Sequence, residues 1–375
     1  MRVAVVTTSL DPGGAETALV SLVLGLTSSG VQASVFSLRG SGRLVSRLRE
    51  VGAEVWPLQV TSVSSAIFSM PFVLREMRRF KPDIVQGWMY HGNLVATVAA
   101  LACDGCLLWG IRQSLGAQER ERATTNRLIR FGAQLSTRPG RIIYNSHRAR
   151  TEHESIGYAP SKGIVIANGF DTDALRPDAT GRARLRQRMQ LSEDTILIGH
   201  IARYHPVKDH ATFLEAASAL SNRGLRVHFL MAGRGVNATN EALTSEIERL
   251  GLTKLVTLHG EASDVSLILT GLDVLCVSSR SEAFPNVIGE AMSCGIPCVT
   301  TDVGDAAQVV CGIGQVVQPG KPGLLADALG TVAQLGPEER ARMGLAARRR
   351  VVERYSLRSM IDQYIRLYGG MLRPH

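Results

Sequence analysis

The chain contains 375 residues, more than a single hydrophobic core usually holds, so its length predicts two domains. Hydrophobic residues make up 45% of the chain and charged residues 20%, the composition of an ordinary globular protein, and this balance excludes an extensively disordered chain. The formal net charge of +9 favours an anionic partner, either a nucleic acid or an anionic membrane surface.

The first residues, MRVAVVTTSLDPGG, lack the long apolar core and the cleavage site of a secretory signal and predict a buried strand instead. The longest apolar stretch, Leu94–Cys103, is about half the ~20 residues that a membrane-spanning helix needs. Cys103 and Cys106 form a C-x-x-C pair, but a zinc site would need a second pair or nearby histidines. We therefore expect reduced structural thiols, a location in the cytoplasm and no membrane span.

Short apolar runs rich in β-branched residues alternate with helical patterns, which is typical of parallel sheets built from βαβ units. In the first half of the chain, the expected strands are Val3–Thr8, Gln32–Leu38, Glu54–Pro57, Ile84–Gln86, Arg141–Asn145 and Gly163–Ala167. The expected helices are Glu16–Leu26, Leu44–Val51 and Phe72–Phe80. The alternation weakens between Arg112 and Arg138, where no element is predicted.

Three residues of the first half fall where predicted strands end. Gly13 and Gly14 lie between the first strand and the first helix, and such a pair lets the backbone approach a phosphate or an acceptor closely. They do not form the G-x-G-x-x-G pattern of dinucleotide sites. His91 lies in a predicted strand-to-helix loop. A lone histidine is usually a structural hydrogen-bonding group, but this position favours orienting a substrate, rather than full base catalysis.

Basic residues are concentrated between Arg112 and Arg150, where nine arginines face only Glu119 and Glu121. The aromatic residues that alternate with basic ones in platforms for single-stranded nucleic acid are missing, so a nucleic-acid partner is not expected. Two interpretations stay open for this region: a solvated face, and a surface that contacts anionic lipid headgroups.

A connector and a second series of elements follow. Residues 168–191 begin with turn residues and carry Pro177 and Gly181, which predicts a link between domains. The expected strands are Ile196–Ala202, Val227–Ala232, Val256–His259, Val274–Ser278 and Pro297–Thr301. The expected helices are His210–Leu220, Glu241–Leu250, Val265–Gly271, Pro285–Cys294, Glu338–Tyr355 and Leu357–Leu372.

The alternation of strands and helices predicts an α/β fold with two Rossmann-like, doubly wound domains that face each other across a cleft. The first domain covers residues 1–170 together with the C-terminal helix 357–375, and the second covers residues 171–356. Ligands of open parallel sheets bind outside the carboxyl ends of the strands, at the point where the strand order reverses. The chemistry is therefore expected in strand-to-helix loops.

The loop after the strand that ends at Ala202 contains Arg203 and Lys208. Two fixed cations suit a departing diphosphate, and this loop has no acidic D-x-D element that could hold a metal ion. Asp171 and Asp173 do form a D-x-D pattern, but in the connector, where we interpret it as a turn. The alternative is that Arg203 and Lys208 are ordinary surface charges.

Residues 278–295, SSRSEAFPNVIGEAMSCG, join a buried strand to a helix that should start near Pro285. Backbone amides from Asn286 onward could hold a phosphate with the help of the helix dipole. Glu282 in the loop and Glu290 inside the helix suit hydroxyl groups at two ends of an elongated ligand. Two solvent-exposed glutamates are the alternative, but the S-x-x-E-x-x-P-N setting after a buried strand favours a ligand site.

Over nearly its whole length the chain resembles the family 4 glycosyltransferases of the GT-B fold, whose mark is an E-x7-E element in a setting like S-E-G-F-P-N. Ala283 stands where glycine is more usual. The resemblance implies that Glu282 contacts hydroxyls of the donor sugar and that Glu290 holds the ribose diol. It also implies that backbone amides of the loop and helix start bind the sugar and the phosphates, in the segment formed by Phe284, Pro285, Asn286 and Val287.

For the other candidates, the resemblance implies that Arg203 and Lys208 bind the phosphates. It further implies that the loop with Gly13 and Gly14 faces the cleft and that His91 lies near the transferred sugar.

These residues favour transfer from the front face of the sugar with retention of its configuration. In this hypothesis Arg203, Lys208 and the helix start stabilise the departing diphosphate, whose oxygen accepts the proton of the acceptor hydroxyl. His91, Arg203, Lys208 and Glu282 are thus the expected catalytic residues, and neither a cofactor nor a metal ion is expected.

The expected partners are a UDP- or GDP-linked sugar and a saccharide or polyprenyl-linked acceptor of a surface polysaccharide such as capsule or O-antigen. The enzyme is expected in the cytoplasm, peripheral on the inner face of the cell membrane. The competing hypothesis on the same fold is a nucleotide-sugar epimerase or hydrolase, which needs no acceptor.

Overall fold

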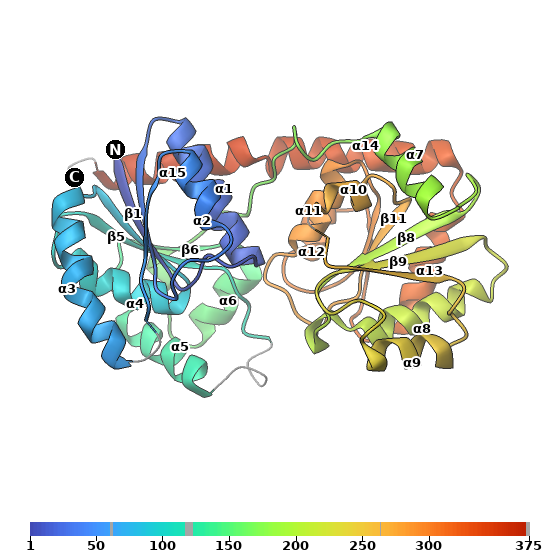
Figure 1. The fold of residues 1–375 in the computed structure, drawn as a ribbon, viewed down its shortest axis with the longest axis horizontal. Coiled ribbons are helices and arrows are strands. Elements are labelled where there is room, and N and C mark those ends of the chain that lie inside the picture. Colours follow the sequence, from blue (N-terminus) through green and yellow to red (C-terminus); the bar gives the residue numbers. More distant parts are fainter. Residues whose placement is uncertain (61–62, 117–122, 263, 373–375) are drawn as a thin grey trace. The chain divides into compact units, whose positions relative to one another are not determined.

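The computed structural model describes residues 1–60, 63–116, 123–262 and 264–372. The chain divides into two compact units, the first formed by Met1–Gly169 with Leu357–His375 and the second by Phe170–Ser356, one residue from the expected boundary. Each unit contains one parallel sheet with helices on both of its faces, which confirms the predicted α/β fold class (Figure 1).

The sheet of the first unit has the strand order β3-β2-β1-β4-β5-β6-β7. Its strands are β1 (Arg2–Thr7), β2 (Gln32–Ser37), β3 (Glu54–Pro57), β4 (Ile84–Trp88), β5 (Cys106–Ile111), β6 (Arg141–Tyr144) and β7 (Gly163–Val165). Its helices are α1 (Gly14–Ser28), α2 (Val45–Glu50), α3 (Val63–Phe80), α4 (Met89–Ala100), α5 (Ala123–Leu135), α6 (His147–Ser155), the short 3-10 helix η2 (Pro160–Lys162) and α15 (Leu357–Leu372). The strand order reverses between β1 and β4, so the sheet is doubly wound.

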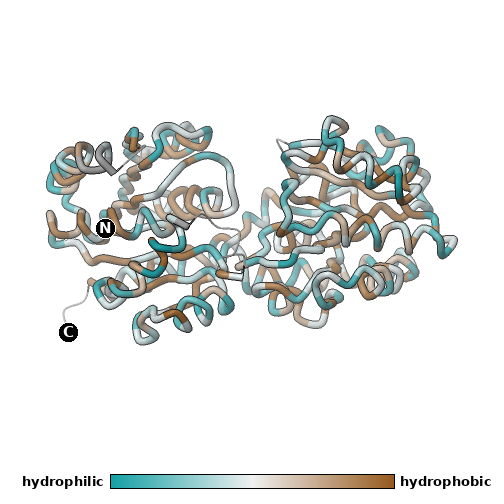
Figure 2. The backbone as a smooth tube through the Cα atoms, turned by 90° about the horizontal axis from the view of Figure 1, so that it is seen from below, coloured by the Kyte–Doolittle hydropathy of each residue, from teal (hydrophilic) through white to brown (hydrophobic). Residues whose placement is uncertain are grey.

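Strand β1 shows why its sequence is hydrophobic without alternation. Val3 and Val5 pack into a core cluster with residues of α1, α2 and α15, whereas Ala4 and Val6 pack into a second cluster with residues of α3 and α4. A strand covered on both faces must be apolar at every position. The covering helices alternate between hydrophilic and hydrophobic residues along their length, as Figure 2 shows, because only one side of each faces a sheet.

Helix α15 packs on helix α1, so the chain returns to the first unit at its C-terminal end, as predicted. A Cβ on Gly25 of α1 would lie 1.8 Å from Ile361 Cδ1, so glycine is required for this close contact. The hydroxyl group of Tyr368 donates to Gln86 Oε1 of β4 at 2.5 Å. Both helix packing and buried polar contacts therefore hold α15 in place.

The sheet of the second unit has the strand order β10-β9-β8-β11-β12-β13 and reverses between β8 and β11. Its strands are β8 (Ile196–Ile201), β9 (Val227–Ala232), β10 (Val256–Gly260), β11 (Val274–Val277), β12 (Cys298–Thr301) and β13 (Gln315–Val317). Its helices are α7 (Ala179–Arg188), the 3-10 helix η3 (Pro206–Lys208), α8 (His210–Ser221), α9 (Glu241–Arg249), α10 (Ser266–Leu269), α11 (Asn286–Ser293), α12 (Ala306–Val310), α13 (Pro322–Ala333) and α14 (Pro337–Arg354).

Three predictions about local structure in the first unit were wrong. Helix α3 begins at Val63 rather than Phe72, because the helix continues through Pro71. Met70 before the proline packs against the same core cluster as Val73 and Met77 after it. The segment where the alternation weakens contains α5, which has few apolar residues but buries Ile129. Helix α4 and strand β5 were not predicted, because the apolar run at Leu94–Cys103 gives no clear period.

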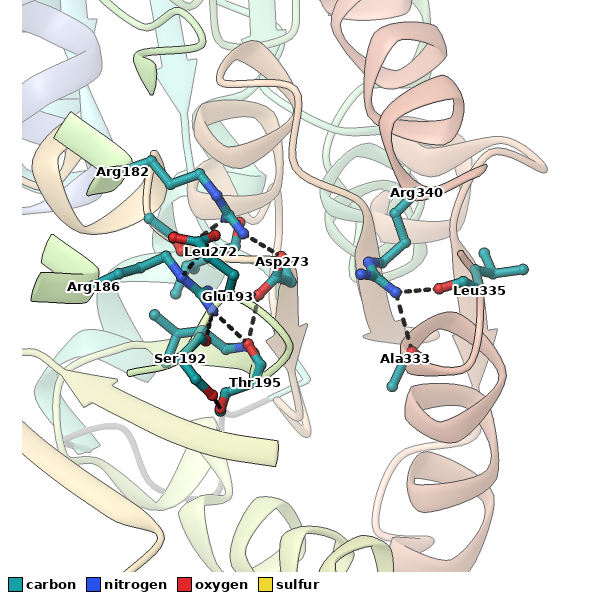
Figure 3. Close-up of polar contacts among 12 residues, drawn as sticks. Arg182, Arg186, Ser192, Glu193, Thr195, Leu272, Asp273, Ala333, Leu335 and Arg340 are labelled. Atoms are coloured by element: carbon teal, nitrogen blue, oxygen red, sulfur yellow. Dashed lines mark hydrogen bonds and ion pairs between the residues drawn. The ribbon is translucent and has the colours of Figure 1, made fainter. Parts of the chain in front are cut away.

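The predicted connector also contains a helix. Asp178 caps α7 by accepting a hydrogen bond from the backbone of Thr180 at 3.0 Å, so the turn residues mark the start of a helix rather than a continuous loop. Arg186 of α7 is almost fully buried and donates to Asp273 Oδ2 at 3.2 Å (Figure 3). Arg182 donates to the other oxygen of Asp273 at 2.8 Å. This cluster ties α7 to the start of β11.

Within the described parts of the chain, no helix combines the length and the apolar character required to cross a lipid bilayer.

Candidate active site

Two loops meet at the carboxyl ends of β8 and β11, the neighbouring strands where the order of the second sheet reverses. The loop after β8 carries Lys208, and the loop after β11 carries Glu282. The backbone amide of Arg280 donates to the carbonyl of Val207 at 2.8 Å, and Ser278 Oγ donates to the carbonyl of Lys208 at 2.9 Å. The structure thus places both predicted residues where ligands of doubly wound sheets bind.

Lys208 and Glu282 form an ion pair in which Lys208 Nζ donates to Glu282 Oε1. Ser279 Oγ donates to the same carboxylate oxygen at 2.7 Å. The two side chains are 23% and 14% exposed, so the pair is partly shielded and yet accessible to a ligand. Arg203, in contrast, is exposed and makes no ion pair with any residue in the described ranges. The sequence therefore identified three charges, of which the fold joins two.

Asp209 lies next to Lys208 and was not recognised in the sequence. Its backbone is left-handed, with φ 49° and ψ 56°, a conformation that aspartate tolerates better than most residues. Its carboxylate oxygen Oδ2 accepts hydrogen bonds from Arg280 Nε and from Thr212 Oγ1, both at 2.7 Å. The Asp209–Arg280 pair therefore joins the loop of Lys208 to the loop of Glu282. The sequence signal was only an aspartate directly after the lysine and an arginine two residues before the glutamate.

The buried His200 contacts Ser278, which in turn bonds the backbone of the loop that carries Lys208. Ser278 Oγ donates its proton to the carbonyl groups of Lys208 and Asp209, so the contact with His200 Nε2 at 3.0 Å requires Nε2 to carry a proton. Burial, followed by the neighbouring His210, holds the pKa of His200 well below its usual value. A neutral histidine with a fixed tautomer can hold Ser278 in place without adding a buried charge.

Replacement of Arg280 by alanine is expected to lower kcat by about tenfold, because loss of one charge-assisted hydrogen bond lets Lys208 and Glu282 move out of register. The conservative variant Arg280→Lys should recover part of the loss, and KM for the donor should change less than kcat. Steady-state kinetics with a thermal denaturation control measures this effect. Arg226→Ala, which breaks an exposed ion pair with Asp194, is the matched control. Wild-type kcat in Arg280→Ala would contradict a positioning role.

Helix α11 begins at Asn286, and Pro285 is its N-cap with φ −77° and ψ 95°. The prediction that Pro285 starts the helix was therefore wrong by one residue: its extended ψ keeps it outside the helix, and the first helical amide belongs to Asn286. The first turn of α11 contains Asn286 and Val287, and the start of a helix favours an anion in general. Phosphate binding by these two residues stays a prediction.

Phe284 points inward instead of toward a ligand. Its ring stacks on Phe170 with centroids 6.2 Å apart, and a Cβ on Gly289 would lie 2.1 Å from the Phe170 ring. This packing anchors the loop and turns the Phe284 side chain into the core, so binding of a ligand by the backbone of this segment stays a prediction. Ala283 does not have a positive φ, so the loop keeps its course without the usual glycine. The carbonyl of Ala283 instead accepts a hydrogen bond from the backbone amide of Asp305 at 3.1 Å.

Glu290 lies one turn after Asn286 on α11 and is partly buried. Burial raises the pKa of Glu290 to about 7 from a usual value of 4.5. Without a ligand, its carboxyl group is thus protonated over much of the range below pH 7 and can donate as well as accept hydrogen bonds.

This shift predicts a pH dependence of stability. Between about pH 4.5 and 7 the folded state keeps a proton that the unfolded state releases, so the contribution of Glu290 to the free energy of unfolding falls as the pH rises. Glu290→Gln removes this effect, and its Tm relative to wild type should increase from pH 4.5 to 7. Thermal denaturation across this range measures the difference. The exposed Glu248→Gln is the control, and parallel curves for Glu290→Gln and wild type would contradict the shift.

The candidates of the first unit also lie at the carboxyl ends of neighbouring strands, β1 and β4. Gly13 is the N-cap of α1 and Gly14 is its first residue. The prediction that His91 lies in a loop was wrong: it lies in the first turn of α4. Helix α4 follows β4 directly because Met89 adopts a positive φ of 64°. Trp88 Nε1 donates to the carbonyl of Ala15 at 2.9 Å and so links the two helix starts.

The electrostatic surroundings of His91 differ from those of Gly13 and Gly14. Burial, followed by the charge of Arg39, lowers the pKa of His91, so its imidazole is neutral at pH 7 and can accept or donate a hydrogen bond. A Cβ on Gly13 would lie 2.4 Å from Glu16 Oε2. The carboxylate of Glu16 therefore lies against the start of α1, where a phosphate would otherwise bind, and this favours an uncharged ligand at Gly13 and Gly14.

No group of three or more histidine, cysteine, aspartate or glutamate side chains in the described ranges could hold a metal ion. Asp171 Oδ1 accepts hydrogen bonds from the backbone amides of Asp173 at 3.1 Å and Ala174 at 3.0 Å. The D-x-D pattern is thus a turn, as the sequence indicated.

Two family models match the chain, "Glycosyltransferase Family 4" over residues 12–174 and "Glycosyl transferases group 1" over residues 195–334. The chain is 29% identical to "Putative glycosyltransferase EpsF" of Bacillus subtilis over 37% of its length and 35% of the relative. It is 29% identical to "N-acetyl-alpha-D-glucosaminyl L-malate synthase" of Bacillus anthracis over 66% of its length and 63% of the relative. The matches thus span less than two thirds of these relatives.

Among solved structures, the chain is similar to Anabaena Alr3699/HepE, determined in complex with UDP-glucose, with a TM-score of 0.86, 21% identity and coverage of 99% of this chain and 100% of that one. This similarity confirms the predicted GT-B fold. Since the two family models match consecutive parts that together span most of the sequence, the chain belongs to the family 4 glycosyltransferases.

Proposed function

We propose that the protein transfers a sugar from a UDP- or GDP-linked donor to a saccharide or polyprenyl-linked acceptor, with retention of configuration and without a metal ion. The observation that carries this proposal is the Lys208–Glu282 ion pair, which joins the loop after β8 to the loop that leads into α11, where the second sheet reverses. One side of such a site is cationic and can bind a diphosphate. The other carries a carboxylate that can accept hydrogen bonds from sugar hydroxyls.

In the proposed mechanism, Arg203, Lys208 and the first-turn amides of α11 stabilise the negative charge that develops on the departing diphosphate. Binding of the diphosphate draws Lys208 away from Glu282 and leaves that carboxylate for the sugar. The bond from the anomeric carbon to the phosphate oxygen breaks, the acceptor oxygen bonds to the same face of that carbon, and the acceptor proton passes to the leaving oxygen. No enzyme nucleophile is needed.

The relatives support the chemical class of the substrates. The structure of HepE with UDP-glucose indicates that a protein of similar fold binds a nucleotide sugar, and the name of the glucosaminyl malate synthase indicates a glucosaminyl product in a relative. We assign the acceptor to the first unit, with Gly13, Gly14 and His91 as its contacts. We further propose that the enzyme works in the cytoplasm, peripheral on the inner face of the cell membrane, in the synthesis of a surface polysaccharide.

A stepwise experiment tests this function. A thermal-shift screen against UDP, GDP and ADP identifies the nucleotide, and the matching nucleotide sugars are then incubated with saccharide acceptors in the presence of EDTA. We expect transfer that EDTA does not abolish, with an NMR spectrum that shows the anomeric configuration of the donor in the product. Inversion, or a strict requirement for a divalent cation, would overturn the mechanism. Conversion of the donor in the absence of acceptor would identify an epimerase or hydrolase instead.

A further inference from the structure

The basic region predicted between Arg112 and Arg150 does not form one surface. Arg112 is 7% exposed and donates to Asn168 Oδ1 at 2.9 Å, and its guanidinium lies 4.2 Å from the centre of the Trp88 ring. Arg148 and Arg150 form ion pairs within α6, with Glu152 and Glu154. Arg120 and Arg122 lie outside the described residues. The arginines that are neighbours in the sequence therefore occupy different places in the fold.

Helices α3 and α5 of the first unit carry exposed arginines, among them Arg127 and Arg130 from the same stretch of sequence. Helix α4 contacts both α3 and α5, and the three cover the same face of the first sheet (Figure 1). Among the residues of these helices, Glu76 of α3 is the only acidic one, and it is 5% exposed. Its carboxylate forms ion pairs with Arg75 at 3.0 Å and with Arg79 at 2.7 Å, so these two arginines are partly neutralised.

The outer side of these helices combines uncompensated cations with large apolar side chains. Arg78 of α3 and Arg127 and Arg130 of α5 are exposed, and none of them pairs with another residue in the described ranges. Phe68 is 84% exposed, Phe131 is 49% exposed, and Leu101, directly after α4, is 84% exposed. We call these six residues, Phe68, Arg78, Leu101, Arg127, Arg130 and Phe131, the α3–α5 face.

The spacing on α5 shows how the two kinds of side chain are combined. Arg130 and Phe131 lie three and four positions after Arg127, so the three residues lie on one side of the helix. Exposed apolar residues scattered singly over a protein need no explanation. Aromatic and aliphatic side chains interspersed with arginines, with no exposed acidic side chain on the same helices, match a surface that meets anionic headgroups and the edge of the acyl region.

We propose that the α3–α5 face docks on an anionic phospholipid bilayer. The arginines would contact lipid phosphates, each worth about a fivefold gain in binding near an anionic surface, and the Phe and Leu side chains would enter the interface. A nucleic acid is a poorer match, because it would use the arginines and leave Leu101 and Phe68 in water. This inference names the surface for the membrane location proposed above, and it does not depend on the identity of the donor or acceptor.

Sedimentation of the full-length protein with vesicles tests the proposal. One vesicle type contains phosphatidylcholine alone and the other contains phosphatidylcholine with a large fraction of phosphatidylglycerol. We expect binding to the anionic vesicles that weakens as salt rises. The triple variant R78Q/R127Q/R130Q should bind at least about tenfold more weakly, and F68S/L101S/F131S should also lose binding.

Matched controls remove the same charge and the same number of exposed apolar side chains elsewhere. R226Q/R249Q/R342Q neutralises three exposed arginines of the second unit, and L267S/L324S/L345S removes three exposed leucines. Both controls should bind like wild type. Equal loss in R226Q/R249Q/R342Q, equal binding to neutral vesicles, or no vesicle binding by wild type would overturn the proposal. The proposal would also be overturned if R78Q/R127Q/R130Q bound vesicles like wild type and instead lost DNA or RNA binding or dimer formation.

The variants also separate this proposal from the proposed function. Because the α3–α5 face lies outside the candidate active site, R78Q/R127Q/R130Q should retain wild-type turnover with a soluble nucleotide sugar and a soluble acceptor. Retained turnover with lost vesicle binding would support docking through this face. Vesicle binding without any sugar transfer would leave docking intact and contradict the function alone.

Discussion

Replacement of Lys208 by alanine is expected to lower kcat by about 10²–10³-fold, the usual effect of removing one donor that stabilises developing negative charge. Its ammonium group is held beside Glu282 by the ion pair and is partly shielded from water, which strengthens its interaction with a diphosphate. The effect on the transition state should exceed that on substrate binding. Steady-state kinetics of Lys208→Ala, with the donor as the varied substrate, measures both quantities.

Two controls make the Lys208 result specific. Lys254→Ala removes an exposed lysine of the same unit and should leave kcat unchanged. Glu282→Gln keeps the shape of the glutamate while removing its charge, and it should lower transfer without unfolding the protein. The assignment fails if Lys208→Ala transfers sugar at the wild-type rate, or if its loss follows a matching fall in Tm.

Replacement of Asp273 by alanine is expected to destabilise the second unit by about 3–5 kcal/mol, since it removes the buried carboxylate that pairs with Arg186 and leaves it the exposed Glu193 at 3.8 Å. Arg186 and Asp273 form an ion pair (Figure 3). Their side chains are 1% and 9% exposed, and Asp273 Oδ2 also accepts from the backbone amide of Leu197 at 2.8 Å. Loss of Asp273 thus disrupts the attachment of α7 and the starts of β8 and β11 together. Thermal denaturation should show a Tm lower by roughly 10 °C.

The exposed ion pair between Arg226 and Asp194 is the natural comparison for Asp273. Its side chains are 75% and 58% exposed, and Asp194→Ala should leave Tm unchanged. An intact Tm in Asp273→Ala would show that Arg186 is satisfied by its remaining bonds to the carbonyl groups of Ser192 and Thr195 at 2.5 and 2.8 Å. In that case the cluster would position α7 without stabilising it.

The sequence predicted most strands because a strand buried on both faces is a short, continuous apolar run that stands out from its surroundings. It was less informative for α5 and α7, because the burial of Ile129 and Arg186 in these helices is visible only in the folded structure. Local signals also placed most helix starts within a residue or two, with α3, which begins nine residues before its predicted start, as the exception. His91 was assigned to a loop because the positive φ of Met89, which lets α4 follow β4 directly, is not visible in its residue type.

Lys208, Glu282 and Glu290 could be found from the sequence alone because each belongs to a motif of neighbouring residues next to a predicted strand. By itself, the sequence thus determined the α/β class, the family resemblance and the loops in which the chemistry should lie. Only the tertiary structure decided that Lys208 pairs with Glu282, that Asp209 binds Arg280 and that the basic residues separate into buried, paired and exposed groups. These contacts join segments about 70 residues apart, and they exist because the strand order places β8 beside β11, a choice made by packing of the whole sheet.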